Sequence, residues 1–536
     1  MSGAGPERPG PERPGPERPG PERPGPERPS RERSGRRVRR DVEQIHQTPW
    51  KQPYNRFPPL EVVSADELEM IHEASLEVLE EIGLEVMSDR ALGLFKAAGA
   101  KVDWGRQHVW IDRGIVAAAL ATVPGEFTLT PRNPARAVTY GGRNIAFGTV
   151  GGPPNCSDLD GGRRPGTHRD SQNLIRLCQS LNCVHVVGSA VAAIDLDAET
   201  RHLDTTYDLL TLSDRLFQGS AIGATRIEDA IDMLCIARGI SRAEIARSPS
   251  LSTVVNTNSP LKVDGPMCDG LMAAAGAGQV VIVTPFTLAG AMAPISLAGA
   301  LAQQNAEALA GITLTQLVRP GVPTMYGGFT SNVDMRSGAP AFGTPEYAKG
   351  ALATGQLTRR YGIPYRSSNV NASNAVDAQA AYESQMALWS SIMGHANLLM
   401  HGVGWLEGGL VASFEKMIVD AEMLQMMAEF LTPIEVTPDA LGLSAMREVG
   451  PGGHFFGAAH TLARYEHAFY TPLLSDWRNF ETWQGAGGLD ATQRANAIYK
   501  ALLAQFEPPP IDPDVAAELR AFADRRRREI ASAARD

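Results

Sequence analysis

Eight short apolar runs, spaced roughly 30 to 40 residues apart, restrict the fold of this chain more than any other feature. The runs are IAFGTV (145–150), VHVVGSAVA (184–192), LFQGSAI (216–222), STVVNTN (252–258), QVVIVTP (279–285), VPTMYGG (322–328), IPYRSSN (363–369) and ANLLMHG (396–402). Amphipathic stretches such as RDSQNLIRLCQSL separate them. Eight strands alternating with helices predict an α/β fold of the (β/α)₈ TIM barrel type. A doubly wound open sheet is the alternative, but GTVGGPP lacks the G-x-G-x-x-G spacing of such sheets.

The remaining chain divides into three further parts. Residues 1–57 form an Arg/Pro-rich tail with five pentapeptide copies, PERPG or PERPS, and we expect this tail to be disordered because it has nothing to pack. Residues 58–140 predict a small N-terminal α/β unit, whose first helix opens with a capping box of Ser64 and Glu67. The barrel occupies 141–430, and 431–536 predict a C-terminal helical extension.

Composition excludes several classes of partner. The net charge of −10, without a dense basic stripe, argues against nucleic acid. No apolar run reaches the roughly 18 residues that span a bilayer, and no signal peptide is recognisable. The five cysteines form no CxxC pair, which indicates reduced thiols in a cytoplasmic protein.

The predicted strand ends supply the candidate site, because catalysis in such barrels occurs at the C-terminal ends of the strands. They carry Asn256, Asn258, Phe286, Tyr326, Gly327, Gly328, Phe329, Asn369, Asn371, His401, Trp405 and Glu407. We expect the glycine pair to leave open space at the barrel mouth. His401 can act as a general base or as a wall residue.

Several kinds of catalytic motif are missing from the sequence. It contains no HExxH helix, no G-x-S-x-G elbow and no lysine at a strand end. Zinc hydrolysis, serine hydrolysis and Schiff-base chemistry are therefore disfavoured. The cysteines and histidines also lack the spacing of metal ligands, so we expect no bound metal.

Several blocks in fixed order resemble the trimethylamine:corrinoid methyltransferase family, in its branch without pyrrolysine. They include FGTVGGPPNCSDLDGGRRPGTHRD, NTNSPL, YGGFTSNVDMRSGAPAFGTPE and HTLARYEHAFYTPLLSDWRNFETW, and the match runs from about residue 58 to the end. The resemblance implies a barrel that passes a methyl group from an amine to the cobalt of a separate corrinoid protein, without binding the corrinoid itself. Related members carry pyrrolysine in the segment that here reads Tyr326-Gly327-Gly328-Phe329.

Chemistry narrows the substrate to a quaternary amine such as a betaine, because this amine leaves as a neutral tertiary amine. Aromatic faces bind quaternary ammonium groups, and Tyr326, Phe329, Phe286 and Trp405 are the candidates. Glu407 can balance the cation. The carboxylate of a betaine needs a cation or an amide as a binding partner, and Arg336, Arg366, Asn256 or His401 could serve. A tertiary amine substrate, a homo-oligomeric state, a lyase that uses no corrinoid and an inactive ligand-binding homologue remain open alternatives.

Overall fold

The computed structural model describes residues 45–533. The pentapeptide repeats lie outside the described residues, so their disorder stays a prediction. Residues 45–57, predicted as part of the same tail, contact the barrel. Gln47 Nε2 donates to Ser180 O at 2.9 Å, and Asn55 Nδ2 donates to Ile392 O at 2.8 Å. The predicted tail boundary at residue 57 is therefore wrong, because polar side chains of this segment bind backbone carbonyls of the barrel.

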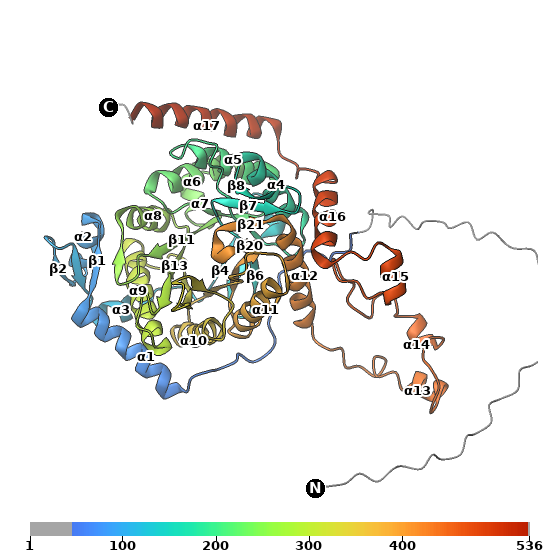
Figure 1. The fold of residues 1–536 in the computed structure, drawn as a ribbon. Helices are drawn as coiled ribbons and strands as arrows, with labels where there is room; N and C mark the ends of the chain where they lie inside the picture. The colour runs from blue at the N-terminus through green and yellow to red at the C-terminus, as the bar shows by residue number, and fades with distance from the viewer. Residues whose placement is uncertain (1–44, 534–536) are drawn as a thin grey trace, which may run out of the picture. The chain divides into compact units, whose positions relative to one another are not determined.

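Eight parallel strands close into a barrel in the order β10-β11-β13-β15-β18-β19-β6-β9. Each coincides with one of the eight predicted runs, and only β11 and β19 extend one residue beyond theirs. The strands are β6 (Ala146–Thr149), β9 (Val186–Val187), β10 (Leu216–Gly219), β11 (Leu251–Thr257), β13 (Val280–Pro285), β15 (Thr324–Gly327), β18 (Tyr365–Ser368) and β19 (Leu398–Val403). The larger helices around them are α4 (His168–Ser180), α5 (Arg201–Leu212), α6 (Ala224–Arg238), α8 (Gly265–Gly276), α9 (Leu297–Val318), α10 (Pro345–Tyr361), α11 (Ala378–Met393) and α12 (Phe414–Phe430), as Figure 1 shows. The predicted (β/α)₈ barrel is confirmed.

The barrel interior is filled at its N-terminal end and reached by solvent at its C-terminal end. A hairpin of β4 (Glu126–Leu129) and β5 (Val138–Gly141) packs against inward-facing side chains such as Ile282 and Met325. Towards the other end, Val254 is partly exposed and Asn256 is exposed, although both lie on barrel strand β11. The C-terminal end is therefore the open mouth, where barrel enzymes place their chemistry.

The N-terminal unit has its own four-stranded sheet, in the order β12-β1-β3-β2. Its helix α1 (Ala65–Glu77) begins with the predicted capping box of Ser64 and Glu67. A π-helical turn (Val78–Ile82) follows and ends at Gly83, whose φ of +76° favours glycine. The other elements of the unit are β1 (Leu84–Val86), α2 (Asp89–Ala97), β2 (Lys101–Asp103), β3 (His108–Trp110), α3 (Arg113–Leu120) and, from the barrel, β12 (Lys262–Val263).

Two small sheets form from the loops that leave the barrel mouth. One contains β20 (Trp405–Leu406), β21 (Val411–Ser413), β7 (Asn155–Asp158) and β8 (Gly162–Pro165). The other contains β14 (Thr287–Ala289), β16 (Thr330–Val333) and β17 (Pro340–Ala341). Short helical segments complete the barrel region: Pro134–Arg136, α7 (Arg242–Ile245) and Glu407–Gly409.

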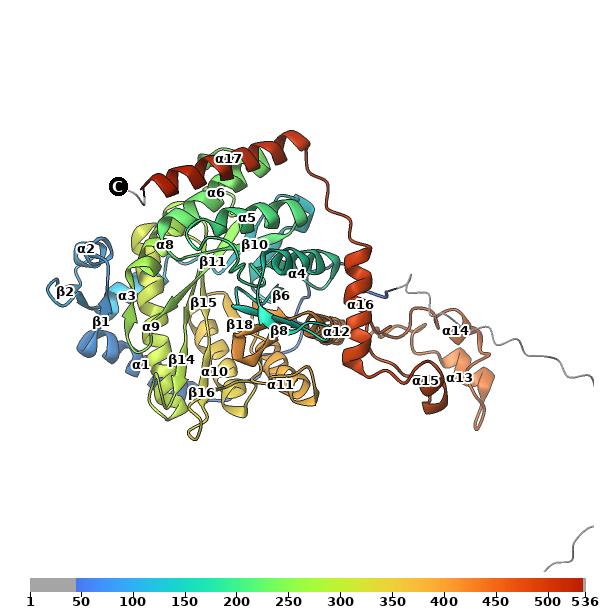
Figure 2. The same cartoon turned by 45° about the horizontal axis from the view of Figure 1, so that its top comes forward.

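Five helices follow the barrel in the C-terminal part of the described chain. They are α13 (Leu443–Val449), α14 (Ala459–Leu462), α15 (Phe480–Gly485), α16 (Ala491–Ala504) and α17 (Pro513–Ala533). Helix α16 packs on α12, whereas α13, α14 and α15 lie beyond these two helices in both Figure 1 and Figure 2. Among residues 45–533, no helix combines the length and apolar character needed to cross a membrane.

Candidate functional site

Four positions on adjacent strands form a row around the inner wall of the mouth. Strand register pairs Asn256 with Thr284, and Gly327 with Arg366. Thr284 and Gly327 each follow an inward-facing residue by two positions, so they share the inner face. A Cβ on Gly327 would lie only 2.0 Å from Thr284 Oγ1, which places these two residues side by side. The row therefore carries one amide, one hydroxyl and one guanidinium.

Arg366 is the buried charge of this row. Its residue is 2% exposed, and its Nε and Nη1 have no hydrogen-bond partner among residues 45–533. Burial lowers the pKa of Arg366 to about 10, so the guanidinium is still charged at neutral pH. A buried charge without a partner costs several kcal/mol, on the order of the penalty for desolvating an ion. An anionic ligand at this position would remove that cost.

Above the row lies an aromatic cluster, which we define as Phe286, Phe329, Phe342, His401 and Trp405. Phe329 is its centre, with ring centroids 5.2 Å from Phe286, 5.7 Å from Phe342 and 6.2 Å from Trp405. The Arg366 guanidinium carbon lies 5.3 Å from the centroid of the Phe329 ring. The predicted aromatics Phe286, Phe329 and Trp405 are thus brought together. Phe342, in the loop after β17, belongs to the cluster although the strand-end rule does not reach it.

His401 joins this cluster in a strained backbone conformation. Its φ is +56°, which is uncommon for a residue with a side chain and is tolerated at functional positions. Its ring centroid lies 4.3 Å from that of Trp405, and Nδ1 is buried without a hydrogen-bond partner in the described chain. Burial, reinforced by the nearby charge of Arg366, holds the pKa of His401 well below its usual range. The imidazole is therefore neutral at neutral pH.

A buried network on α12 holds the segment that carries His401 and Trp405. Asp420 Oδ2 accepts a hydrogen bond from Gly404 N at 2.9 Å, and its Oδ1 accepts one from Asn369 Nδ2 at 3.1 Å. Lys416 pairs with Asp420 and donates to Ser384 Oγ at 2.9 Å. Sequence reasoning missed this pair, because a lysine and an aspartate four residues apart on a helix usually indicate an exposed ion pair.

A second amide fixes Trp405 directly. Asn371 Nδ2 donates to Trp405 O at 2.7 Å, and Trp405 Nε1 donates to Asn371 O at 2.9 Å. The Oδ1 atoms of Asn369 and Asn371 are buried without a partner among residues 45–533. The predicted asparagines that follow β18, Asn369 and Asn371, therefore position the wall of the mouth rather than lying free in it.

The glycine pair does not leave open space, contrary to the prediction. Consecutive strand residues face opposite sides, so only Gly327 faces the barrel interior. A Cβ on Gly328 would lie 2.7 Å from Thr354 Cγ2 of α10 and 3.1 Å from the ring of Tyr365. Neither glycine has a positive φ. Both are small because neighbouring side chains approach closely: Thr284 at Gly327, and Thr354 at Gly328.

Four other predicted residues are not members of the aromatic cluster. Tyr326 faces α9, where its hydroxyl donates to Asn305 Oδ1 at 3.2 Å. Glu407 forms an ion pair with Arg163 at 2.9 Å, so it is not a free counter-ion. Arg336 is exposed on the loop between β16 and β17, and Asn258 is exposed after β11.

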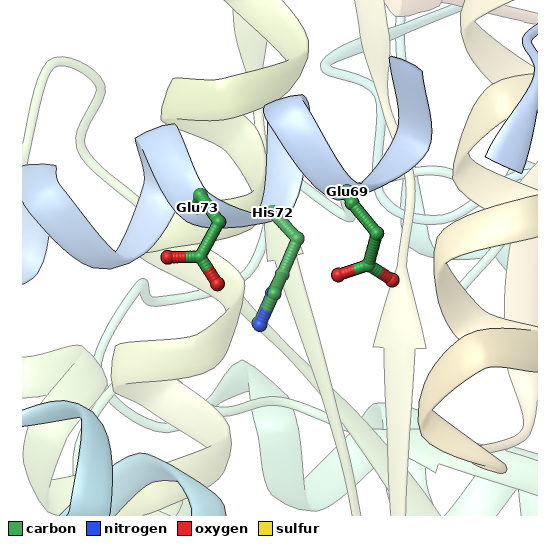
Figure 3. Close-up of side chains that lie close together, drawn as sticks. All are labelled: Glu69, His72 and Glu73. Carbon is green, nitrogen blue, oxygen red and sulfur yellow. The ribbon is translucent and has the colours of Figure 1, made fainter. Parts of the chain in front are cut away.

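One group of potential metal ligands occurs among the described residues, on α1 and far from the barrel strands in sequence. Glu69, His72 and Glu73 offer ligand atoms within 4.8 Å of one another (Figure 3). Glu69 already pairs with Arg360 at 2.5 Å, and Glu73 pairs with Arg113 at 2.9 Å. Two arginines beside the group disfavour a bound cation, and the absence of a metal stays a prediction.

Comparison with known proteins gives the family. A family model described as trimethylamine methyltransferase (MTTB) matches residues 29–531. A glycine betaine methyltransferase of Desulfitobacterium hafniense is 39% identical over 82% of this chain and 91% of its own length. Trimethylamine methyltransferases of D. hafniense and Methanosarcina mazei are each 28% identical, over 82% and 87% of this chain and 88% and 95% of their own lengths. The resemblance seen in the sequence is confirmed, and the chain belongs to the trimethylamine methyltransferase (MTTB) family of methyltransferases.

Proposed function

We propose that this enzyme transfers a methyl group from a betaine, a quaternary amine that carries a carboxylate, to the cobalt of a separate corrinoid protein. Family membership supports methyl transfer from a methylated amine. The relative with 39% identity is named for glycine betaine, whereas relatives at 28% identity are named for trimethylamine. The residues of the mouth support the narrower choice.

The substrate carboxylate binds to Arg366 at the inner end of the mouth. The two unpartnered N–H groups of this guanidinium, Nε and Nη1, can donate charge-assisted hydrogen bonds to a carboxylate. Thr284 Oγ1, which also has no partner in the described chain, adds a donor from the neighbouring part of the row. A tertiary amine such as trimethylamine has no group that would use these donors.

The quaternary ammonium group then rests among the aromatic rings. Each desolvated aromatic face contributes about 0.5–2 kcal/mol to binding of a cation. Phe286, Phe329 and Trp405 come from three different strand ends, so together they can surround a trimethylammonium group. With its carboxylate held inward at Arg366, the substrate points its methyl groups outward, where a partner protein can approach.

The chemistry needs no proton donor from this chain. The methyl carbon's bond to nitrogen breaks while its bond to cobalt forms, and both bonding electrons stay on nitrogen, so the product is a neutral tertiary amine. Cobalt(I) supplies the electron pair of the new bond. The neutral state of His401 fits this step, because a charged imidazolium would repel the ammonium group. The residues of the mouth bind the substrate, orient it and exclude water from it.

The observation that carries the proposal is the buried, unpaired Arg366 beneath an aromatic cluster. Methyl transfer from glycine betaine to cob(I)alamin, followed by the change in the cobalt absorption spectrum, tests it. Tetramethylammonium and choline are the matched substrates, because each has a quaternary nitrogen and no carboxylate. We expect transfer from glycine betaine at a rate at least tenfold above both. Equal rates from all three, or transfer from trimethylamine alone, would contradict the proposal.

A further inference from the structure

The segment between α12 and α16, residues 431–489, which we call the arm, exposes an unusual number of large apolar side chains. Of 32 such exposed side chains among the described residues, 13 lie in these 59 residues of the 489 described. They are Ile434, Val436, Leu441, Leu443, Met446, Phe455, Phe456, Leu462, Tyr465, Phe469, Trp477, Phe480 and Leu489. Phe456 and Phe469 are the most exposed of the aromatic ones, at 85% and 84%.

The summed exposed apolar area of the arm is comparable with the area that a protein–protein interface buries. At roughly 100 Å² of exposed surface for each partly exposed large side chain, the arm presents on the order of 1,000 Å² of apolar surface. Monomers rarely expose more than a few hundred Å² in one patch. A stable interface needs about 800 Å² from each partner. The arm alone is therefore large enough for a stable interface.

The arm is anchored to helix α12 of its own barrel near residues 473–475. Glu422 of α12 is 4% exposed, and one of its carboxylate oxygens, Oε2, accepts the backbone N–H groups of Leu473 and Leu474 at 2.7 and 3.0 Å. Ser475 Oγ donates to the other carboxylate oxygen, Oε1, at 2.7 Å. These hydrogen bonds fix residues 473–475 of the arm against α12. The exposed side chains before and after these residues thus belong to a segment tied to the folded protein.

A second apolar surface lies on the outer side of α11 and α12, and we call it the α11–α12 patch. Tyr382, Met386 and Trp389 recur at i, i+4 and i+7 on α11, and all three are at least 40% exposed. The Trp389 ring lies 4.8 Å from the ring of Phe430, the last residue of α12, which is also exposed. The arm begins at the next residue. One chain thus carries two exposed apolar surfaces that adjoin in sequence.

We propose that a second copy of this chain covers both surfaces, with the arm of each copy lying over the α11–α12 patch of the other. In a two-fold dimer of this kind, the same contact between arm and patch occurs twice, so the arm and the patch of both copies are covered. Only nine of the 59 arm residues are Asp, Glu, Lys or Arg, and four of these form ion pairs within the arm, Arg464 with Asp439 and Arg478 with Asp476. An apolar surface of this kind is typical of permanent interfaces, whereas a corrinoid protein must bind and leave during turnover and needs a more polar one.

Sedimentation of the full chain at micromolar concentration tests the proposal. We expect the wild-type protein to be a dimer or a larger assembly built from dimers. The arm variant Phe456→Asp/Phe469→Asp and the patch variant Tyr382→Asp/Met386→Asp should each lower the mass to that of a smaller species. Met70→Asp is the matched control, because Met70 is 64% exposed on α1, outside both surfaces. Its assembly should be unchanged, and all variants should keep the wild-type circular dichroism spectrum, which shows that they fold.

Crosslinking between two differently tagged copies tests the pairing itself. One copy carries Phe456→Cys and the other Met386→Cys, with a bismaleimide linker added to the mixture. A product that joins the two tags supports arm-over-patch contact, and products joining only two arms would overturn it. A monomeric wild-type protein would also overturn the proposal. So would arm variants that stay dimeric but lose methyl transfer to the corrinoid protein while keeping transfer to free cobalamin, since the arm would then bind that protein.

Discussion

Removing the carboxylate of Asp420 should destabilise the protein strongly, because it leaves a buried ammonium group without a counter-ion. Lys416 and Asp420 are both fully buried, and Asp420 also accepts from Gly404 N and Asn369 Nδ2. Breaking a buried pair by removing one partner costs about 3–5 kcal/mol, whereas replacing both partners by apolar residues is often nearly neutral. We therefore expect Asp420→Ala to lower stability by about 3–5 kcal/mol and Lys416→Met/Asp420→Leu to cost clearly less.

Thermal unfolding of the wild-type protein, Asp420→Ala and the double variant measures this difference in stability. Methyl transfer below the Tm measures the role of the network in the site. The double variant should be folded yet reduced in kcat, because Gly404 N and Asn369 Nδ2 lose the carboxylate that positions the segment carrying Trp405. Its KM should change less than its kcat. A double variant that is as unstable as Asp420→Ala would refute the reasoning about the buried charge. Full activity in a folded double variant would refute the positioning role.

Three further outcomes are expected. Gly328→Ala should lower the Tm by forcing a Cβ to within 2.7 Å of Thr354, whereas turnover of the remaining folded protein should stay near wild type. Burial lowers the pKa of His185 to about 4, because the folded protein disfavours the protonated ring. The free energy of unfolding is therefore highest above about pH 6.5 and falls as the pH drops towards 4. This histidine alone should make unfolding at pH 5 easier by about 2 kcal/mol than at pH 8, and His185→Asn should remove that part of the pH dependence. Glu422→Ala should release the 470–475 segment, and limited proteolysis should then cleave the arm faster.

The barrel was predictable from the sequence because its strands are short apolar runs at regular spacing, bounded by amphipathic helices. The strand-end rule also located Phe286, Phe329, His401 and Trp405, which meet in one cluster. These predictions depend only on periodicity and on the position of a residue at the end of a strand.

What the sequence could not provide was the direction of each side chain. Tyr326, Gly327 and Gly328 are consecutive, yet only the middle residue faces the barrel interior, and a one-residue shift of register would reverse this. The burial of Lys416 was likewise hidden, because its charge alone predicts an exposed position. Phe342 comes from a loop whose path depends on the small sheet formed with β16.

Direct binding of glycine betaine and tetramethylammonium to wild-type protein and to Arg366→Met, measured by calorimetric titration, tests the central claim most directly. A charge-assisted hydrogen bond contributes about 1.5–3 kcal/mol, or roughly 10- to 150-fold in Kd. We expect Arg366→Met to raise the Kd for glycine betaine by that factor. The Kd for tetramethylammonium should be unchanged or slightly lower, since a nearby positive charge is removed. Equal loss of both ligands in a folded variant, or no loss of either, would contradict the assignment of Arg366 as the carboxylate-binding residue.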